Sequence, residues 1–197
     1  MKIIGLTGPS GVGKSTVAQM AKDLGFYVID CDKTSKAVSQ NISVLKKIEK
    51  AFPGTVSGTT LDRKKLAQKA FSDSKSTELL NGIMLPEINK EIEKEIASAQ
   101  KNGFNLILLD APTLFESGFD KKCIAVIAVL SDENLRKERL VLRDGLTNEQ
   151  LKARLNAAKS NSFYIEKTPY IIYNNGELNK YTDDTLKLLK QLICEMR

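Results

Sequence analysis

The sequence predicts an α/β protein, a three-layer sandwich around a five-stranded parallel sheet. Three observations carry this prediction. Five apolar runs have the length and composition of buried strands, and helical stretches alternate with them. A glycine-rich loop connects the first run to the first helical stretch. The runs occupy residues 2–6, 26–30, 105–110, 123–130 and 170–173.

The glycine-rich loop, GPSGVGKST at residues 8–16, has the spacing of a phosphate-binding loop, the P-loop of NTPases. Its glycines let successive backbone N–H groups turn toward an anion at the start of a helix. We expect Lys14 to reach the β- and γ-phosphates of a nucleotide, and the Ser15 hydroxyl to ligate Mg²⁺. The strand–loop–helix order favours this interpretation over an accidental glycine turn. The expected nucleotide-binding residues are Gly8, Gly11, Val12, Gly13, Lys14, Ser15 and Thr16.

The composition narrows the class of partner. The chain has 197 residues and a formal net charge of +6, which favours anionic partners. No basic block is interleaved with aromatic residues and there is no Trp, so we expect phosphorylated small molecules and no nucleic acid. Because the sequence contains no His, a general base must be a carboxylate or water.

The sequence also predicts a cytoplasmic protein. No apolar run approaches the roughly 18 residues of a membrane span, and the first residues enter a strand without a signal peptide. Cys31, Cys123 and Cys194 are far apart and form neither a metal-binding pattern nor a disulfide framework. A reducing compartment is therefore expected. We expect a monomer or a weak homo-oligomer with no membrane partner.

Two segments interrupt the predicted nucleotide-binding core of residues 1–32, 105–130 and 162–197. Residues 33–104 are largely helical and far longer than a crossover needs, so we expect a substrate-binding insertion, with a purely structural decoration as the alternative. Residues 131–161 read as two helices and are expected to form a lid. Ser131 is the expected N-cap of the first helix. Thr147 and Gln150 have capping-box spacing at the second.

Asp30 and Asp32 close the second predicted strand, at the sheet edge where ligands of such folds bind. Strand alternation would place both carboxylates on one side. One of them could orient and deprotonate an acceptor hydroxyl. The alternative is that they are turn or cap residues. Asp110 ends the third run, and a carboxylate there is expected to hold Mg²⁺.

Arg136, Arg139 and Arg143 lie on one face of the first lid helix. Phosphoryl transfer requires cations on the equatorial oxygens, so we favour Arg139 and Arg143 as residues that stabilise the transferred group. The alternative is a solvated basic stripe. Arg63 in the insertion could hold a phosphate or carboxylate of the second substrate.

The sequence resembles the dephospho-CoA kinases nearly from end to end. The matching segments are GLTGPSGVGKSTVA, LGFYVIDCD, LDRKKLAQKAF, LLDAPTLFESG, RLVLRD and IIYNNGEL. The last three discriminate best, because many P-loop kinases share the first. The resemblance implies transfer of the γ-phosphoryl group of MgATP to the 3′-hydroxyl of dephospho-CoA, and a fold with a nucleotide core, a helical CoA subdomain and a lid.

The resemblance also implies roles for individual residues. Asp32 would be the catalytic base, with Arg139 and Arg143 near the phosphates. Asn174 and Asn175 would border the adenine of ATP, since an amide offers both a donor and an acceptor. The implied acceptor-binding residues are Asp30, Arg63, Phe71, Leu114 and Glu116.

The sequence departs from the family pattern at three positions, where it has Gly8-Pro9, Leu85-Pro86 and Lys159. Three other classes of P-loop protein are alternatives to the dephospho-CoA kinases. Shikimate kinase would require a triple-glycine strand end, and this chain contains no Gly-Gly pair. For a nucleoside or nucleotide kinase of the adenylate type, DAPTLFE is a poor match. A regulatory switch would require a base-specificity motif such as N-K-x-D, which is missing.

Overall fold

The computed structural model describes residues 1–156 and 158–195. This part of the chain forms two compact units. The first contains residues 1–29 together with the described residues from 99 onward, and the second contains residues 30–98. The second unit overlaps most of the predicted insertion of residues 33–104, and the predicted division into core, substrate-binding insertion and lid stays a prediction.

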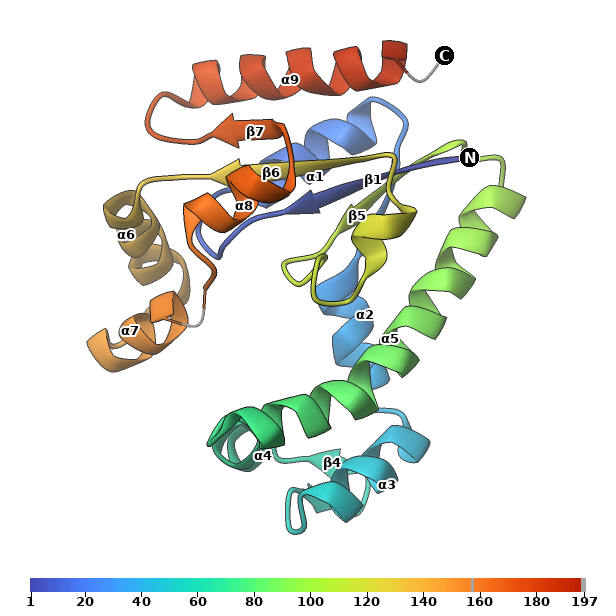
Figure 1. Cartoon of the computed structure of the whole chain (residues 1–197), viewed down its shortest axis with the longest axis vertical. Helices are drawn as coiled ribbons and strands as arrows, with labels where there is room; N and C mark the ends of the chain where they lie inside the picture. Colours follow the sequence, from blue (N-terminus) through green and yellow to red (C-terminus); the bar gives the residue numbers. More distant parts are fainter. Residues whose placement is uncertain (157, 196–197) are drawn as a thin grey trace. The chain divides into compact units, whose positions relative to one another are not determined.

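The first unit is built on the predicted five-stranded sheet (Figure 1). Its strands run in the order β2-β5-β1-β6-β7. Strand β1 pairs in parallel with β5 and β6, and β6 pairs in parallel with β7. The bounds of the strands are β1 Lys2–Thr7, β2 Tyr27–Asp30, β5 Leu106–Asp110, β6 Ala125–Leu130 and β7 Tyr170–Tyr173.

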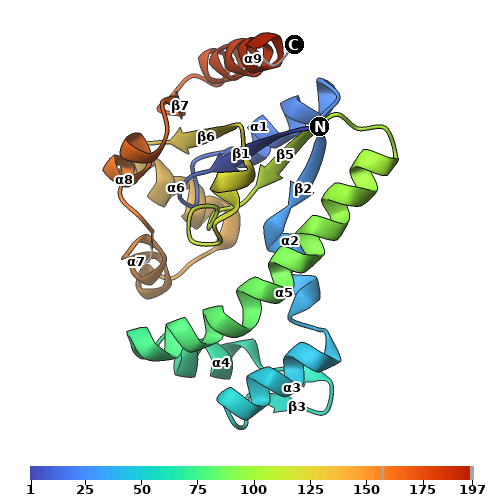
Figure 2. The same cartoon turned by 45° about the vertical axis from the view of Figure 1, so that its right-hand side comes forward.

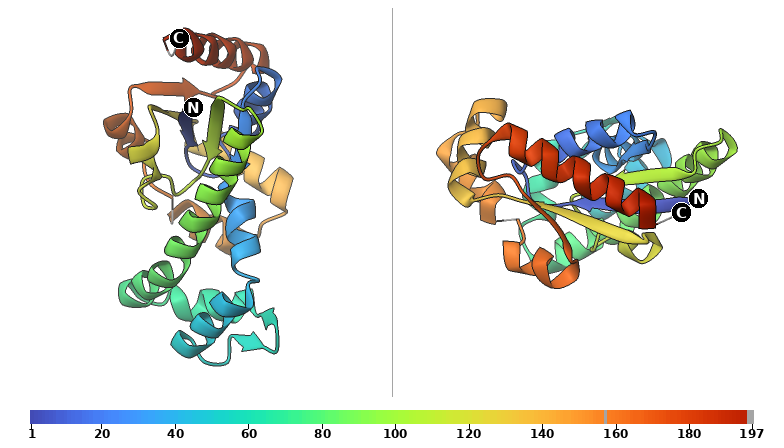
Figure 3. Two further views of the ribbon diagram at one scale, coloured as in Figure 1. Left: turned by 90° about the vertical axis from the view of Figure 1, so that its right-hand side faces the viewer. Right: turned by 90° about the horizontal axis from the view of Figure 1, so that it is seen from above.

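Helices cover both faces of the sheet, so the predicted three layers are confirmed. Alternate residues of β6 face opposite sides. Ile127 and Val129 belong to the core shared with α1 (Lys14–Asp23) and α9 (Leu178–Glu195), two helices that lie side by side in Figure 3. Ala128 and Leu130 pack with Tyr164 of α8 (Asn161–Lys167) on the other face.

The second unit is mainly helical, as expected. It contains α2 (Cys31–Val38), α3 (Ile42–Ala51), a hairpin of β3 (Val56–Ser57) and β4 (Thr60–Leu61), and α4 (Arg63–Ala70). Helix α5 (Ser74–Lys101) starts in this unit and continues through Pro86 as one helix (Figure 2). The unit has its own apolar core, formed by Val38, Val44, Ile48, Phe52, Leu66, Ala70 and Leu80.

The segment between β6 and α8 differs in part from the prediction. Strand β6 is followed by α6 (Glu133–Asp144) and α7 (Asn148–Asn156), the two helices that the sequence predicts. Strand β6 is preceded by a 3₁₀ turn, η1 (Phe119–Lys122). The expected N-cap at Ser131 is wrong, because the helix is preceded by Asp132 while Ser131 is buried and donates to the Asn174 carbonyl at 2.7 Å. The capping box between Thr147 and Gln150 is present, with hydrogen bonds of 3.0 and 3.3 Å.

Helices α6 and α7 belong to the first unit and form no unit of their own in the part of the chain that the structure describes. Leu140 on α6 is fully buried. The lid therefore stays a prediction, and its first helix is anchored at Leu140. No helix among the described residues is long and apolar enough to cross a bilayer.

Candidate functional site

The loop between β1 and α1 is shaped by three glycines with positive φ. The φ angles are 133° at Gly8, 85° at Gly11 and 99° at Gly13, a region that other residues rarely adopt. A Cβ at Gly8 would lie 2.2 Å from the Val129 carbonyl oxygen. A Cβ at Gly13 would lie 2.6 Å from the amide nitrogen of Asn174. The loop therefore requires glycine both for its dihedrals and for its close approach to neighbouring strands.

Side chains hydrogen-bond five carbonyl groups of this loop, and the donors lie on α1, α6, α9 and the segment after β7. The longest of these bonds joins Lys14 Nζ to the Pro9 carbonyl at 3.4 Å. The other bonds are Lys14 Nζ to Gly8 at 2.8 Å, Arg136 Nε to Ser10 at 3.1 Å, Asn174 Nδ2 to Val12 at 2.8 Å and Tyr181 Oη to Gly13 at 2.8 Å. Carbonyls bonded to the surrounding protein leave backbone N–H groups for the concave side of a loop, the arrangement of an anion-binding nest. The carbonyl contacts hold the loop in one conformation, and phosphate binding by its N–H groups stays a prediction.

Two of these donors, Tyr181 and Arg136, were not among the predicted site residues. Tyr181 lies on α9, and burial raises the pKa of its hydroxyl above the usual range, so it stays a protonated donor. Arg136 is only 6% exposed and packs against Gly11. A sequence shows the helical spacing of such residues, but it does not show which face the fold buries.

The two asparagines after β7 make contacts within the protein that differ from the expected adenine contacts. Asn174 is buried, and its side-chain oxygen accepts a hydrogen bond of 3.1 Å from Arg139. Asn175 accepts from the backbone N–H of Asp132 at 2.9 Å and donates to the Asp132 carboxylate at 3.2 Å. Because Asn174 is buried and bonded at both ends of its amide, it braces the P-loop, and the expectation that it faces adenine is corrected.

The three arginines of α6 lie in different environments, so the predicted stripe is not uniform. Arg136 is buried, whereas Arg139 is partly buried and donates to the Ser131 hydroxyl at 3.2 Å and to Asn174. Arg143 is exposed and forms a 2.7 Å ion pair with Asp144, which also pairs with Arg154. Arg143 is therefore the member of the stripe whose guanidinium lies in solvent.

Asp30 and Asp32 do not share one side of a strand as expected. Strand β2 ends at Asp30, and α2 begins at Cys31. The Asp30 carboxylate accepts from the backbone N–H of Lys33 at 2.9 Å and caps the helix. Asp32 lies in the first turn of α2 and is exposed. The strand alternation fails because the cap converts the chain to helix one residue before Asp32.

The two predicted Mg²⁺ ligands lie in the first unit. Asp110 ends β5 and is paired in register with Leu6, two residues before Gly8. Ser15 is in the first turn of α1 and is exposed. No cluster of three or more His, Cys, Asp or Glu side chains occurs among the described residues. This donor set fits Mg²⁺, which is commonly held by one or two protein oxygens together with substrate phosphates.

One predicted acceptor contact is wrong. Leu114 is fully buried, and its side chain packs against Gly5 of β1, so it belongs to the core. Glu116 is exposed in the first unit. In the second unit, Arg63 is exposed and donates to the Ser39 hydroxyl at 3.2 Å. Phe71, the C-cap of α4, is 64% exposed, which is unusual for a phenylalanine.

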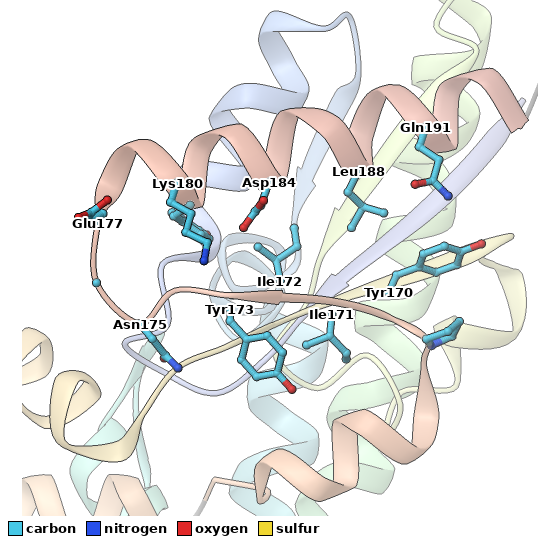
Figure 4. A pocket seen from close by; sticks show the side chains of 13 residues that line it. Tyr170, Ile171, Ile172, Tyr173, Asn175, Glu177, Lys180, Asp184, Leu188 and Gln191 are labelled. Carbon is cyan, nitrogen blue, oxygen red and sulfur yellow. The ribbon is translucent and has the colours of Figure 1, made fainter.

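A groove of about 730 Å³ lies between β7 and α9. Figure 4 shows Tyr170 and Tyr173 on the strand and Lys180 and Asp184 on the helix. Asn175 lies at one end of it, and its described lining contains no residue of the P-loop. Tyr181 also lines the groove, and its hydroxyl donates to the Gly13 carbonyl, so the groove and the P-loop share this residue.

A parallel sheet, with a P-loop between its first strand and first helix that side chains hold by hydrogen bonds, defines a P-loop kinase-type fold. The family model for dephospho-CoA kinase matches residues 2–180. A dephospho-CoA kinase of Deinococcus radiodurans is 36% identical over 189 residues, covering 96% of this chain and 91% of that protein. The chain belongs to the dephospho-CoA kinase family, and it is accordingly an ATP-dependent kinase.

Solved structures agree with this assignment. A dephospho-CoA kinase from Campylobacter jejuni superposes with a TM-score of 0.70 at 26% identity, covering 98% of each chain. A protein from Thermus thermophilus superposes with a TM-score of 0.84 at 28% identity, covering 100% of this chain and 98% of that one.

Proposed function

We propose that this protein transfers the γ-phosphoryl group of ATP to the 3′-hydroxyl of dephospho-CoA. The observation that carries the proposal is the P-loop, whose carbonyls are held by Lys14, Arg136, Asn174 and Tyr181, in a chain of this family. Backbone N–H groups of Gly11 to Thr16 would bind the nucleotide phosphates. Both substrates are small anionic molecules, which agrees with a net charge of +6.

Lys14 and Arg143 are the proposed cations at the transferred group, and Arg139, which donates to Ser131 and Asn174, stays a proposed residue near the phosphates. Lys14 rests on the carbonyls of Gly8 and Pro9, at 2.8 and 3.4 Å, and a bound phosphate would offer its ammonium a charged acceptor instead. Arg143 is exposed, so its guanidinium can turn toward a ligand at little cost in desolvation. Its ion pair with Asp144 is solvent-exposed, and such surface pairs contribute little to stability, so the pair can open at small cost.

Mg²⁺ is part of the proposal as the partner of ATP. Ser15 and Asp110 are the residues that would hold it, at the start of α1 and the end of β5. The ion would neutralise charge on the phosphate oxygens of the nucleotide. The Ser15 hydroxyl and the Asp110 carboxylate supply the oxygen ligands that Mg²⁺ prefers.

Asp32 is the proposed base. The chain contains no His, so a carboxylate is the side chain available to accept the proton of the acceptor hydroxyl near neutral pH. Asp30 is committed to capping α2, whereas Asp32 is exposed and follows the carboxyl end of β2. This difference favours Asp32 over Asp30. Asp30, Arg63, Phe71 and Glu116 remain proposed acceptor contacts, and Asn175 a proposed neighbour of adenine.

The experiment that tests the proposal is ADP release from MgATP with dephospho-CoA, adenosine, AMP and shikimate offered separately. We expect ADP release with dephospho-CoA only. Release with another acceptor would keep the P-loop kinase chemistry and show that the insertion serves a different substrate. Lys14→Ala is the control for contaminating kinase activity, because it removes the lysine from the phosphate-binding loop.

A further inference from the structure

Arg136 carries a buried positive charge that no ion pair neutralises in the described part of the chain. Its side chain is 6% exposed. Glu133 attracts this charge only from outside ion-pair distance, and its own ion pair is with Lys137 at 2.7 Å. Burial lowers the pKa of the Arg136 guanidinium, but an arginine stays charged at neutral pH.

The position of this charge is fixed against the P-loop. Arg136 Nε donates to the Ser10 carbonyl at 3.1 Å. The Arg136 carbonyl oxygen lies only 3.0 Å from the position that a Cβ would occupy at Gly11, so the two backbones are in close contact. Its Nη2 atom is buried without a hydrogen-bond partner. Burying an unpaired charge and an unpaired donor is costly for folding, and such a group is expected where a ligand provides the missing interaction.

We propose that Arg136 is a positioning residue whose buried charge is balanced by the phosphates of the bound nucleotide. Its hydrogen bond to Ser10 holds the loop, and its charge raises the positive potential inside the nest. The inference rests on the proposed binding of nucleotide phosphates at this loop. It assigns Arg136 a role that differs from those of Lys14 and Arg143, which are proposed to touch the phosphates themselves.

If the Arg136 charge is balanced by phosphate, its effect on nucleotide affinity should increase with the negative charge of the nucleotide. In a low-dielectric surrounding, a fixed charge attracts a triphosphate more strongly than a monophosphate. A residue that only supports the fold would affect the affinities for ATP, ADP and AMP equally. It would also stabilise the protein in the absence of ligand, whereas an unpaired buried charge would not.

The test is calorimetric titration of ATP, ADP and AMP into the wild type and Arg136→Gln, which removes the charge and keeps a hydrogen-bond donor. We expect ATP affinity to fall by about tenfold, ADP affinity by less and AMP affinity by no more than about twofold. Thermal unfolding without ligand should stay at the wild-type temperature or rise. Arg136→Lys should restore ATP affinity to within about threefold of the wild type, because it keeps the charge.

Lys152→Gln is the control, since it removes one charge from an exposed position of α7 and should leave ATP affinity within about twofold. Three results would overturn the proposal: equal losses for all three nucleotides, no loss for ATP, or failure of Arg136→Lys to restore binding. Arg136→Met keeps the apolar volume if the glutamine variant is unstable. The proposed function is tested separately, by turnover of the wild-type protein with dephospho-CoA. That measurement uses no Arg136 variant, so the two proposals can fail independently.

Discussion

The amide nitrogen of Asn174 lies 2.8 Å from the carbonyl oxygen of Val12, across 162 positions of sequence. This bond joins the loop after the last strand to the P-loop after the first. The same side chain accepts a hydrogen bond from Arg139 at 3.1 Å. One buried amide thus connects α6, β7 and the phosphate-binding loop, so the loop geometry depends on residues far from it in the sequence.

Replacing Asn174 with Ala should weaken both folding and nucleotide binding. The change leaves the Val12 carbonyl without its side-chain donor and removes one of the two Asn174 acceptors of Arg139 Nη2, and we expect a loss of about 1–3 kcal/mol in unfolding free energy. The KM for ATP should rise. Urea unfolding and initial-rate kinetics are the measurements. An Asn174→Ala protein with wild-type stability and KM would show that this bond does not hold the loop.

The P-loop glycines should tolerate no side chain. Gly13→Ala combines a φ of 99° with a Cβ 2.6 Å from the Asn174 amide, so we expect loss of ATP binding together with a lower unfolding temperature. Gly145→Ala is the matched control, since it also has a positive φ but meets no atom within 4 Å. The control should cost about 1 kcal/mol and leave ATP affinity unchanged. Equal effects of the two changes on ATP binding would contradict the close approach at Gly13.

The two neighbouring aspartates should give opposite signatures. Asp32→Asn is expected to lower kcat by orders of magnitude and leave ATP affinity nearly intact, because it removes only the proposed base. Asp30→Ala removes the cap of α2 and should lower stability by about 1 kcal/mol. Steady-state kinetics and thermal unfolding of both variants separate the two roles. Turnover of Asp32→Asn within a few-fold of the wild type would exclude Asp32 as the base.

Glu49 should contribute to the acid sensitivity of the second unit. Backbone N–H groups of Gly54, Val56 and Thr55 hydrogen-bond its carboxylate and hold its pKa below the usual 4.5. Since the folded pKa is the lower one, the stabilisation is present above pH 4.5 and is lost as the pH falls through the folded pKa.

Glu49→Gln removes this titrating group, so unfolding should depend less on pH below 4.5 than it does in the wild type. Urea unfolding at a series of pH values between neutrality and pH 3 measures it. Identical pH profiles for the two proteins would show that the hairpin contacts of Glu49 do not stabilise its charged form.

The sheet and the P-loop could be predicted from the sequence because both signals are local. Apolar runs mark the strands, and the spacing of Gly8, Gly13 and Lys14 marks the loop. Strand β7 was predicted with the bounds that the structure has, Tyr170–Tyr173. These features depend on neighbouring residues, so no tertiary information is needed to find them.

The remaining site features depend on tertiary packing. Arg136 and Arg143 are both arginines of one helical stripe, and only the packing of α6 against Gly11 makes the first buried and the second exposed. The sequence around Leu114 does not distinguish an exposed loop residue from a core residue. In the fold, Leu114 is fully buried and packs against Gly5 of β1. Asp32 lies in a helix and not at the end of a strand as predicted, because the Asp30 carboxylate caps α2 and ends the strand.

The most direct test of the central claim is the ³¹P NMR spectrum of the product formed from dephospho-CoA and MgATP. We expect one new phosphomonoester signal, coupled to the ribose 3′ proton, that forms together with ADP and is absent with Lys14→Ala. A new signal at another hydroxyl, or ADP formation with inorganic phosphate and no phosphomonoester, would contradict the assignment of the acceptor.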